Sequence, residues 1–358
     1  YRPVILPLEP SAGTDDLARD LVSGLAGATA IAAADFDEDG LPDLVRGYSG
    51  ASGGFGTLQP GNVRAIFPVG SPARQARGDA PAREYPFHRS TGLFRLPAAP
   101  DFLCTGDFDA DGHQDVVSAE KGDRSLYLLG GDGRGGLKPA RRIEVPGSIT
   151  SLAAGETNRA DGLRDLMLGV VAGDGPAVLI FEGPVGALAS EPEVLPLAQV
   201  PVALAPGRLD SHPSIDLAIA AGDELLIVHG RESREPAAAP LQVDRYEVRS
   251  RLQDLAVGEF VRQQDYIQEV GLLLDDGGLI VLGRGETSSP ASGEEFKHLL
   301  DGGLGEPSNG LFLAASRIYG NPTEDLILVD PESSLTRAFE ADLGHATGFE
   351  LSGRPVAA

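Results

Sequence analysis

The feature that most constrains this fold is a unit that recurs six times along the chain. Each copy contains an apolar run, an acidic turn, a second apolar run that opens with an acid, a Gly-containing turn and a third apolar run. The opening acids are Asp43, Asp115, Asp165, Asp216, Glu269 and Asp325. The first two lie 72 residues apart, and the later spacings are 50, 51, 53 and 56 residues. A period of about 50 residues with several short apolar runs is typical of β-propellers.

The apolar runs have the length of strands. Runs such as 125–129, 177–181 and 224–228 hold five residues each and are bounded by turn-forming residues. The chain contains 47 Gly and 27 Pro, which indicates many turns. Only residues 14–25 have the pattern of a short helix. The sequence therefore predicts an all-β fold, a β-propeller of six to seven four-stranded blades.

One domain is expected to span residues 1–358. Its blade repeats are expected to start near residues 28, 101, 149, 200, 252 and 310. Residues 354–358 resemble residues 200–204, the lead-in to the fourth copy, and residues 2–6 form a candidate strand at the other end. Two explanations stay open: the two ends combine into the last blade, or the chain continues past Ala358.

The long first spacing predicts an insertion of residues 46–100 in the first repeat. This segment begins Gly-rich and then carries seven arginines against only Asp79 and Glu84. One interpretation is a loop that binds an anionic group or docks on a neighbouring acidic face. The other is a solvated insertion whose charge has no function.

Two of the acidic turns have the spacing of a calcium loop. Acids stand at positions 1, 3, 5 and 9 and Gly at position 6 in both turns, namely Asp35, Asp37, Asp39, Gly40 and Asp43, and Asp107, Asp109, Asp111, Gly112 and Asp115. Calcium takes six to eight oxygen ligands with loose geometry, and alternate carboxylates on a curled backbone supply them. Gly at position 6 permits the curl. The position-7 carbonyls of Leu41 and His113 are expected to complete the two calcium sites.

The third copy offers a further calcium candidate, built from Glu156, Asn158, Asp161 and Asp165. It has one more residue in its turn than the first two copies have. The alternative for every such loop is an acidic turn that binds nothing, but two matches in the same phase of a repeat favour metal. The fourth to sixth copies lack the carboxylate set, so their opening acids are expected to cap turns.

The segments 31–45 and 103–117, which hold these loops, resemble the FG-GAP/VCBS repeat of integrin α-subunit propellers and of many bacterial surface proteins. This resemblance implies an integrin-alpha-like propeller, usually seven-bladed, whose matched carboxylates bind calcium in hairpin loops on one rim. The loops here stand in the first copies, whereas integrin α-chains carry them in later blades. The resemblance is therefore closer to bacterial surface or secreted members. It implies an extracellular location and a role in cell adhesion or ligand recognition.

Three functions remain open from the sequence. The first is a non-catalytic module that binds a protein or carbohydrate ligand; the second is a carbohydrate-active lyase or hydrolase; the third is a rigid spacer of a larger surface protein. No catalytic or cofactor-binding residue is predicted. Acids, His and Tyr that converge at the mouth of the central channel would favour an enzyme.

Net charge and the remaining residue types limit the classes of partner and of binding site that we expect. The formal net charge of −24 disfavours nucleic acid and anionic membrane surfaces. No apolar run reaches the roughly 18 residues of a membrane span, and the single cysteine, Cys104, permits no internal disulfide. The six histidines include no pair four residues apart and share no repeat phase, so they are expected at surface or strand-end positions.

Overall fold

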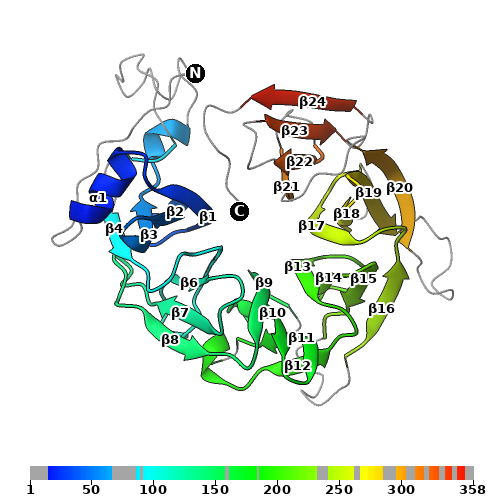
Figure 1. Ribbon diagram of the computed structural model, residues 1–358, viewed down its shortest axis with the longest axis horizontal. Helices are drawn as coiled ribbons and strands as arrows, with labels where there is room; N and C mark the ends of the chain where they lie inside the picture. Colours follow the sequence, from blue (N-terminus) through cyan, green and yellow to red (C-terminus); the bar gives the residue numbers. More distant parts are fainter. Residues whose placement is uncertain are drawn as a thin grey trace.

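The six repeats fold into six four-stranded antiparallel sheets arranged as the blades of a propeller (Figure 1). The computed structural model describes residues 15–66, 86–88, 92–157, 161–183, 185–231, 241–261, 267–284, 296–303, 311–317, 322–329, 335–340 and 345–350. Each blade uses four strands that follow one another in the chain, from the centre of the ring outward.

The strands fall into four sets by their place in the blade. The innermost strands are β1 Gly27–Ala34, β5 Phe102–Gly106, β9 Ser148–Gly155, β13 Pro201–Gly207, β17 Leu252–Gly258 and β21 Phe312–Ser316. The second strands are β2 Asp43–Gly50, β6 Asp115–Ala119, β10 Asp165–Ala172, β14 Asp216–Ala221, β18 Glu269–Leu274 and β22 Asp325–Val329. The third strands are β3 Gly53–Gln59, β7 Ser125–Leu129, β11 Gly175–Phe181, β15 Glu224–Val228, β19 Gly278–Arg284 and β23 Leu335–Glu340. The outermost strands are β4 Gly92–Arg95, β8 Arg141–Glu144, β12 Glu193–Pro196, β16 Val243–Glu247, β20 Phe296–Gly303 and β24 His345–Glu350.

Burial explains why the second strands read as continuous apolar runs. Every residue of β6, β14 and β18 is buried, because each blade is covered on both faces by its neighbours. The outermost strands are more exposed, and β8 buries none of its residues fully.

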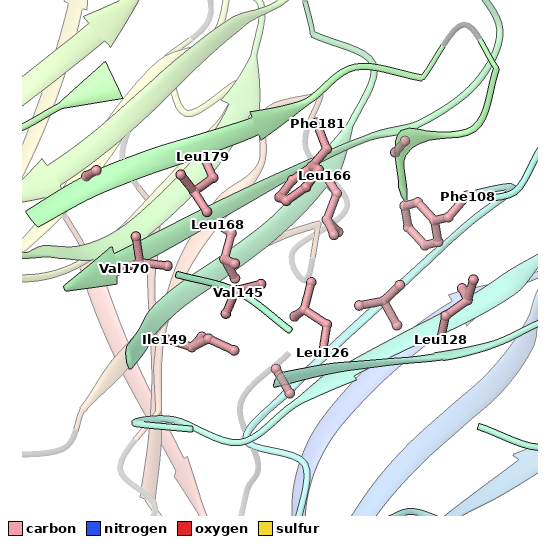
Figure 2. Close-up of a cluster of buried hydrophobic side chains, with 14 residues drawn as sticks. Phe108, Leu126, Leu128, Val145, Ile149, Leu166, Leu168, Val170, Leu179 and Phe181 are labelled. Carbon is pink, nitrogen blue, oxygen red and sulfur yellow. The ribbon is translucent and has the colours of Figure 1, made fainter. Parts of the chain in front are cut away.

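The core consists of layers between neighbouring blades. Figure 2 shows one of them, in which Phe108, Leu126 and Leu128 of blade 2 meet Leu166 and Leu179 of blade 3. Similar clusters join blade 1 to blade 2, blade 3 to blade 4, blade 4 to blade 5 and blade 5 to blade 6. Burial of each large apolar side chain contributes about 1.5–3 kcal/mol to stability. Because these side chains lie between neighbouring blades, each blade interface adds its own share to the stability of the ring.

Glycine ends several innermost strands because the next blade comes very close there. A Cβ on Gly207 would lie 2.3 Å from Cγ1 of Val257, and one on Gly155 would lie 2.5 Å from Cγ of Pro206. Real Cβ atoms do not approach other atoms this closely, so the sequence needs Gly at these positions to let the blades converge.

The expected insertion of residues 46–100 is wrong for most of its length. These residues hold most of β2 and all of β3 and β4, and Phe55, Leu58 and Leu93 are buried. The extra length of the first repeat lies in the connection between β3 and β4. That connection contains the 3₁₀ helix η1 Val63–Ile66, and residues 67–85 within it lie outside the described residues.

A short helix, α1 Asp15–Val22, packs beside blade 1, as the sequence predicts. Leu17 of this helix is fully buried against Tyr48 and Phe55, whose rings stack 5.1 Å apart. A second 3₁₀ helix, η2, spans Ala187–Ala189. None of the described helices has the length and apolar content needed to cross a membrane.

The described residues form six blades, the lower of the two expected numbers. Blade 1 draws its four strands from residues 27–95 and blade 6 from residues 312–350, so neither combines strands from the two ends of the chain. Residues 2–6 and 354–358, which were expected to contribute to a last blade, lie outside the described residues.

Candidate functional site

The acid that opens the second strand of each blade is buried, and we call these six residues the anchor acids. They are at most 2% exposed and comprise Asp43, Asp115, Asp165, Asp216, Glu269 and Asp325. In blade 2, Asp115 Oδ2 accepts the backbone N–H of Phe108 at 2.9 Å, and its Oδ1 accepts that of Gly131 at 2.9 Å. The anchor acid therefore joins the loop after the first strand to the loop after the third.

The same pair of bonds recurs in blades 1, 3 and 4. Asp43 accepts the N–H groups of Phe36 and Gly61 at 2.9 and 2.8 Å, and Asp216 accepts those of Leu209 and Gly230 at 3.0 and 2.9 Å. Burial raises the pKa of the anchor acids Asp115, Asp165 and Asp216, although their N–H donors oppose the shift. The pKa of Asp115 rises to about 6, that of Asp165 rises to about 7, and that of Asp216 also rises.

Loop 1, residues 35–43, brings its first three acids together. Carboxylate oxygens of Asp35, Asp37 and Asp39 lie within 4.8 Å of one another. The loop curls because Asp35 accepts the N–H of Gly40 at 2.9 Å and that of Asp39 at 3.1 Å. Gly40 has φ of 87° and Glu38 has φ of 57°, so position 6 uses the freedom of Gly as the sequence predicts.

The carboxylates of loop 1 repel one another. Burial raises the pKa of Asp37, and the charges of Asp43, Asp39 and Asp35 raise it further. A divalent cation between these oxygens would cancel much of that repulsion. Loop 1 therefore gathers three carboxylates closely, with the anchor acid Asp43 outside the close group.

Loop 2, residues 107–115, repeats this backbone path but distributes its acids differently. Asp107 accepts the N–H of Gly112 at 2.9 Å and that of Asp111 at 3.1 Å. The close group here is Asp107, Asp109 and Asp115. Asp111 instead pairs with Nζ of Lys138 at 2.7 Å, and this contact lowers the pKa of Asp111. Lys138 thus forms an ion pair with Asp111, one of the predicted calcium ligands.

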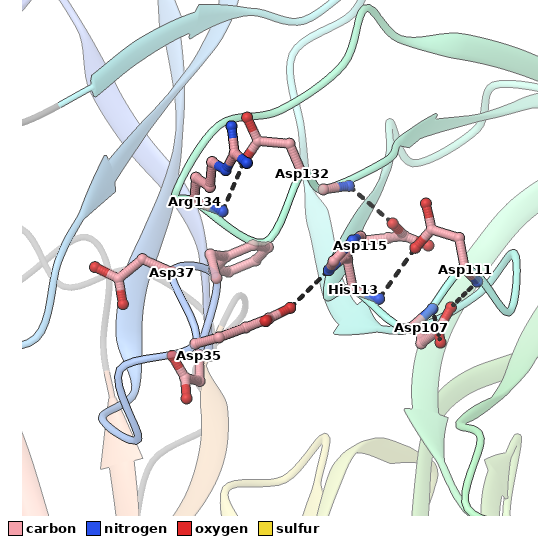
Figure 3. A network of polar contacts seen from close by, with 12 residues as sticks. Asp35, Asp37, Asp107, Asp111, His113, Asp115, Asp132 and Arg134 are labelled. Atoms are coloured by element: carbon pink, nitrogen blue, oxygen red, sulfur yellow. Dashed lines mark hydrogen bonds and ion pairs between the residues drawn. The ribbon is translucent and has the colours of Figure 1, made fainter.

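Figure 3 shows that the two loops are joined across the blade 1–blade 2 interface. Glu38 Oε1 contacts Nδ1 of His113 at 2.6 Å, which raises the pKa of His113. The 130–138 loop of blade 2 lies beside both, because the N–H of Gly135 donates to the carbonyl of Phe36 at 2.9 Å. Loops 1 and 2 are therefore in direct contact across this interface.

The position-7 residues have the same backbone contact in both loops. The N–H of Leu41 donates to Asp39 Oδ1 at 2.9 Å, and the N–H of His113 donates to Asp111 Oδ1 at 3.0 Å. Their role as carbonyl ligands stays a prediction, while the His113 ring has the separate contact with Glu38 described above.

The third candidate loop shares the hydrogen-bond pattern but forms no close group of three acids among the described residues. Glu156 accepts the N–H of Gly162 at 2.5 Å, and Asp161 accepts the N–H of Leu163 at 2.9 Å. The anchor acid Asp165 accepts the N–H and Oγ1–H of Thr157, both at 2.9 Å. Asn158 lies outside the described residues.

Blade 4 holds a cluster that the sequence analysis missed. Ligand atoms of Asp210, Asp216 and His229 lie within 4.8 Å of one another. Nδ1 of His229 is 3.0 Å from Asp210 Oδ2, and Nε2 is 2.9 Å from Asp244 Oδ2. These carboxylates raise the pKa of His229 to about 9, with Asp210 the largest cause. His229 does stand at a strand end, but no local spacing connects it to acids up to 19 residues away.

The centre of the ring contains a cavity of about 530 Å³ lined mostly by the innermost strands. Most of its lining residues are apolar, among them Leu103, Leu204 and Phe312, but polar atoms form about half of its exposed surface, and the described lining residues include no His or Tyr. Its main charged side chains are Asp101, Lys121 and Asp254; further polar side chains come from Ser151 and Gln253.

Comparisons with known proteins support the fold. No family model and no curated protein sequence matches the chain. Among solved structures, it is similar to BBS1N in complex with ARL6DN, soaked with mercury, at 11% identity and a TM-score of 0.57, covering 93% of this chain and 84% of that one. The lead-soaked crystal of the same complex gives 11% identity, a TM-score of 0.56 and coverage of 90% and 82%. At this identity the likeness shows the propeller fold alone.

Proposed function

We propose that this chain is a calcium-binding β-propeller of the FG-GAP/VCBS type that acts as an extracellular adhesion or recognition module for a protein or carbohydrate ligand. The observation that carries the proposal is the close approach of Asp35, Asp37 and Asp39 in loop 1, with the same backbone path in loop 2 of the next blade. The two loops contact each other through Glu38 and His113.

The expected calcium affinity supports an extracellular location. Most ligands of each site come from one short, exposed loop, and the anchor acid already serves backbone N–H groups. Sites of this kind bind calcium with Kd of about 10⁻⁴–10⁻³ M, so they fill only where calcium is millimolar. One filled site then stabilises the fold by about 0.5–1.5 kcal/mol.

Recognition rather than catalysis fits the ring centre and the fold. The described residues that line the central cavity are mostly of apolar types and include no His or Tyr. The similar propeller BBS1N is found in complex with ARL6DN, which is a precedent for a propeller in a protein complex. The net charge of −24 disfavours a nucleic-acid ligand and favours a basic or calcium-bridged one.

Calcium titration by calorimetry tests the metal assignment. We expect two sites in the wild-type chain, loss of the loop 1 site in Asp37→Asn and loss of the loop 2 site in Asp109→Asn. Glu144→Gln is the matched control, because Glu144 is an exposed acid on β8 away from both loops. An unchanged titration in both loop variants, or no calcium binding at 5 mM (about fivefold above the weaker expected Kd), would contradict the proposal.

A second experiment tests recognition itself. The chain is applied to arrays of glycans and of extracellular proteins, with calcium or with chelator. We expect binding that requires calcium and is lost in the Asp37→Asn, Asp109→Asn double variant. Breakdown of a polysaccharide by the chain, without stable binding in either array, would favour the carbohydrate-active enzyme instead.

A further inference from the structure

We propose that blade 4 contains a second kind of metal site, in which Asp210, Asp216 and His229 bind a divalent transition-metal ion such as Zn²⁺. This site is separate from the proposed calcium loops. It occupies the same place in its blade, because the N–H of Leu209 donates to Asp216 as that of Phe36 donates to Asp43. Asp210 thus stands where Asp37 and Asp109 stand in loops 1 and 2.

The distances suit a small ion. Nδ1 of His229 is 3.0 Å from Asp210 Oδ2 and 3.7 Å from Asp216 Oδ1. Ligands about 2.0–2.1 Å from a tetrahedral Zn²⁺ are about 3.3–3.4 Å from one another. The observed separations bracket that value, so an ion fits between the three groups with small side-chain movements.

The outer contact of His229 has the arrangement found at metal-binding histidines. Its Nε2 lies 2.9 Å from Asp244 Oδ2, while Nδ1 faces Asp210 and Asp216. A metal-ligating histidine usually donates its second ring N–H to a carboxylate, which fixes the tautomer and makes the ligating nitrogen more basic. Asp244 is therefore a positioning residue for His229 here.

The donor set distinguishes this site from loops 1 and 2. Calcium prefers oxygen ligands alone, whereas imidazole nitrogen favours zinc and other first-row transition ions. Loops 1 and 2 have carboxylates only in their close groups, but blade 4 adds an imidazole from the loop after its third strand. Its side chains are also better shielded: Asp210 is 14% exposed, His229 is 13% exposed and Asp216 is 1% exposed.

The alternative to a bound metal ion is a protonated imidazole on His229. Without metal, His229 itself supplies the positive charge between the carboxylates. An ion on Nδ1 would replace that proton, so metal and proton compete for one position. The experiment must therefore separate a metal site from a histidine clamp held by hydrogen bonds alone.

The test is Zn²⁺ binding to the full chain, measured against a chelating indicator in 5 mM calcium, which exceeds the expected Kd of the oxygen-only loops. We expect one Zn²⁺ per chain at micromolar concentration, and at least a tenfold loss of affinity in His229→Gln. Asp244→Ala is expected to weaken binding about 10- to 100-fold, and Asp244→Asn less, because its amide oxygen still accepts the Nε2–H. His212→Gln removes another histidine of blade 4, in the loop that holds Asp210, and is the matched control.

A measurement on the wild-type chain keeps the proposal testable if a variant fails to fold. Crystals soaked in Zn²⁺ are examined by anomalous scattering at the zinc edge. A peak bonded to Nδ1 of His229 supports the site. Equal Zn²⁺ affinity in the folded His229→Gln variant, peaks only at loops 1 and 2, or no binding at 100 µM Zn²⁺ would overturn it. Here 100 µM is about a hundredfold above a micromolar Kd, where a single site is nearly saturated. The cluster would then be a clamp held by hydrogen bonds alone.

Discussion

The acids of one nine-residue motif do two different things in this protein. In loop 2, Asp115 is fully buried and each of its oxygens accepts a backbone N–H, although it also belongs to the close group of carboxylates. Asp107 and Asp109, the other two members of that group, are more exposed. The comparison teaches that the anchor acid builds the blade even where it lies in a close group of carboxylates, whereas the earlier, more exposed acids are available for ion chemistry. It also explains why blades without a calcium-type loop still keep an acid at that position.

Removing an anchor acid should have the largest effect. Asp115→Ala leaves the buried N–H groups of Phe108 and Gly131 without their acceptor, which costs about 2–4 kcal/mol of unfolding free energy. Urea unfolding in chelator measures this loss. Asp109→Ala in the same loop is the control, and we expect a change within about 0.5 kcal/mol. Equal losses of unfolding free energy in the two variants would contradict the distinction between the anchor acid and the earlier acids of the loop.

The next largest expected effect is the pH dependence of the unfolding free energy that the anchor acid Asp165 causes. Asp165 is 1% exposed and has a pKa of about 7, above its ordinary value of 3.8, because burial disfavours the charged form. Between pH 3.8 and pH 7 the carboxyl group of Asp165 holds a proton in the folded chain but not in the unfolded chain, and this difference stabilises the fold. The stabilisation is lost as pH rises toward 7 and beyond. From pH 5 to pH 8 the contribution falls by about 2–3 kcal/mol.

The measurement for Asp165 is the unfolding free energy in chelator, for the wild type and for Asp165→Asn. We expect the wild type to lose stability relative to the variant between pH 5 and pH 8. A constant difference between the two chains over that range would show that the hydrogen bonds from Thr157 and Gly183 hold the carboxylate ionised in the folded state.

A smaller effect concerns the difference between loops 1 and 2. Lys138 pairs with Asp111, so it competes with calcium in loop 2 and has no equivalent contact described in loop 1. Lys138→Met should tighten calcium binding at loop 2 by about 3- to 10-fold, because one positive charge near the ion is removed. Calorimetry in the Asp37→Asn background, which isolates loop 2, measures the change. Weaker binding would mean that Lys138 supports the loop rather than competing with the ion.

The smallest expected effect is at the contact between the two loops. Glu38 raises the pKa of His113 through the contact at 2.6 Å, so Glu38→Gln should move the His113 pKa down toward 6.5. Proton NMR titration in chelator follows this directly, while the melting temperature should barely change because both side chains are exposed. An unchanged His113 pKa would mean that the loops are not in contact in solution.

Local sequence determined the repeat and the shape of its loops. The apolar runs and their period of about 50 residues predict four-stranded blades, because short strands can bury their side chains only against further copies. Asp35, Asp37, Asp39 and Gly40 lie within six residues of one another, so their spacing alone fixes the curl of loop 1. The long first spacing and the Gly-rich start do not mark an insertion over all of residues 46–100, because these glycines belong to β2 and β3, and close packing against Phe94 and Ala98 needs glycine in β3.

Tertiary structure decided the contacts that cross strands and blades. Lys138 reaches Asp111 from 27 residues away, and His113 meets Glu38 from 75 residues away. His229 joins Asp210, Asp216 and Asp244 only because antiparallel pairing brings the loop after β15 beside the loop after β13 and the strand β16. Sequence spacing carries information about neighbours on one loop, but the chemistry at a blade edge depends on which strands the fold places together.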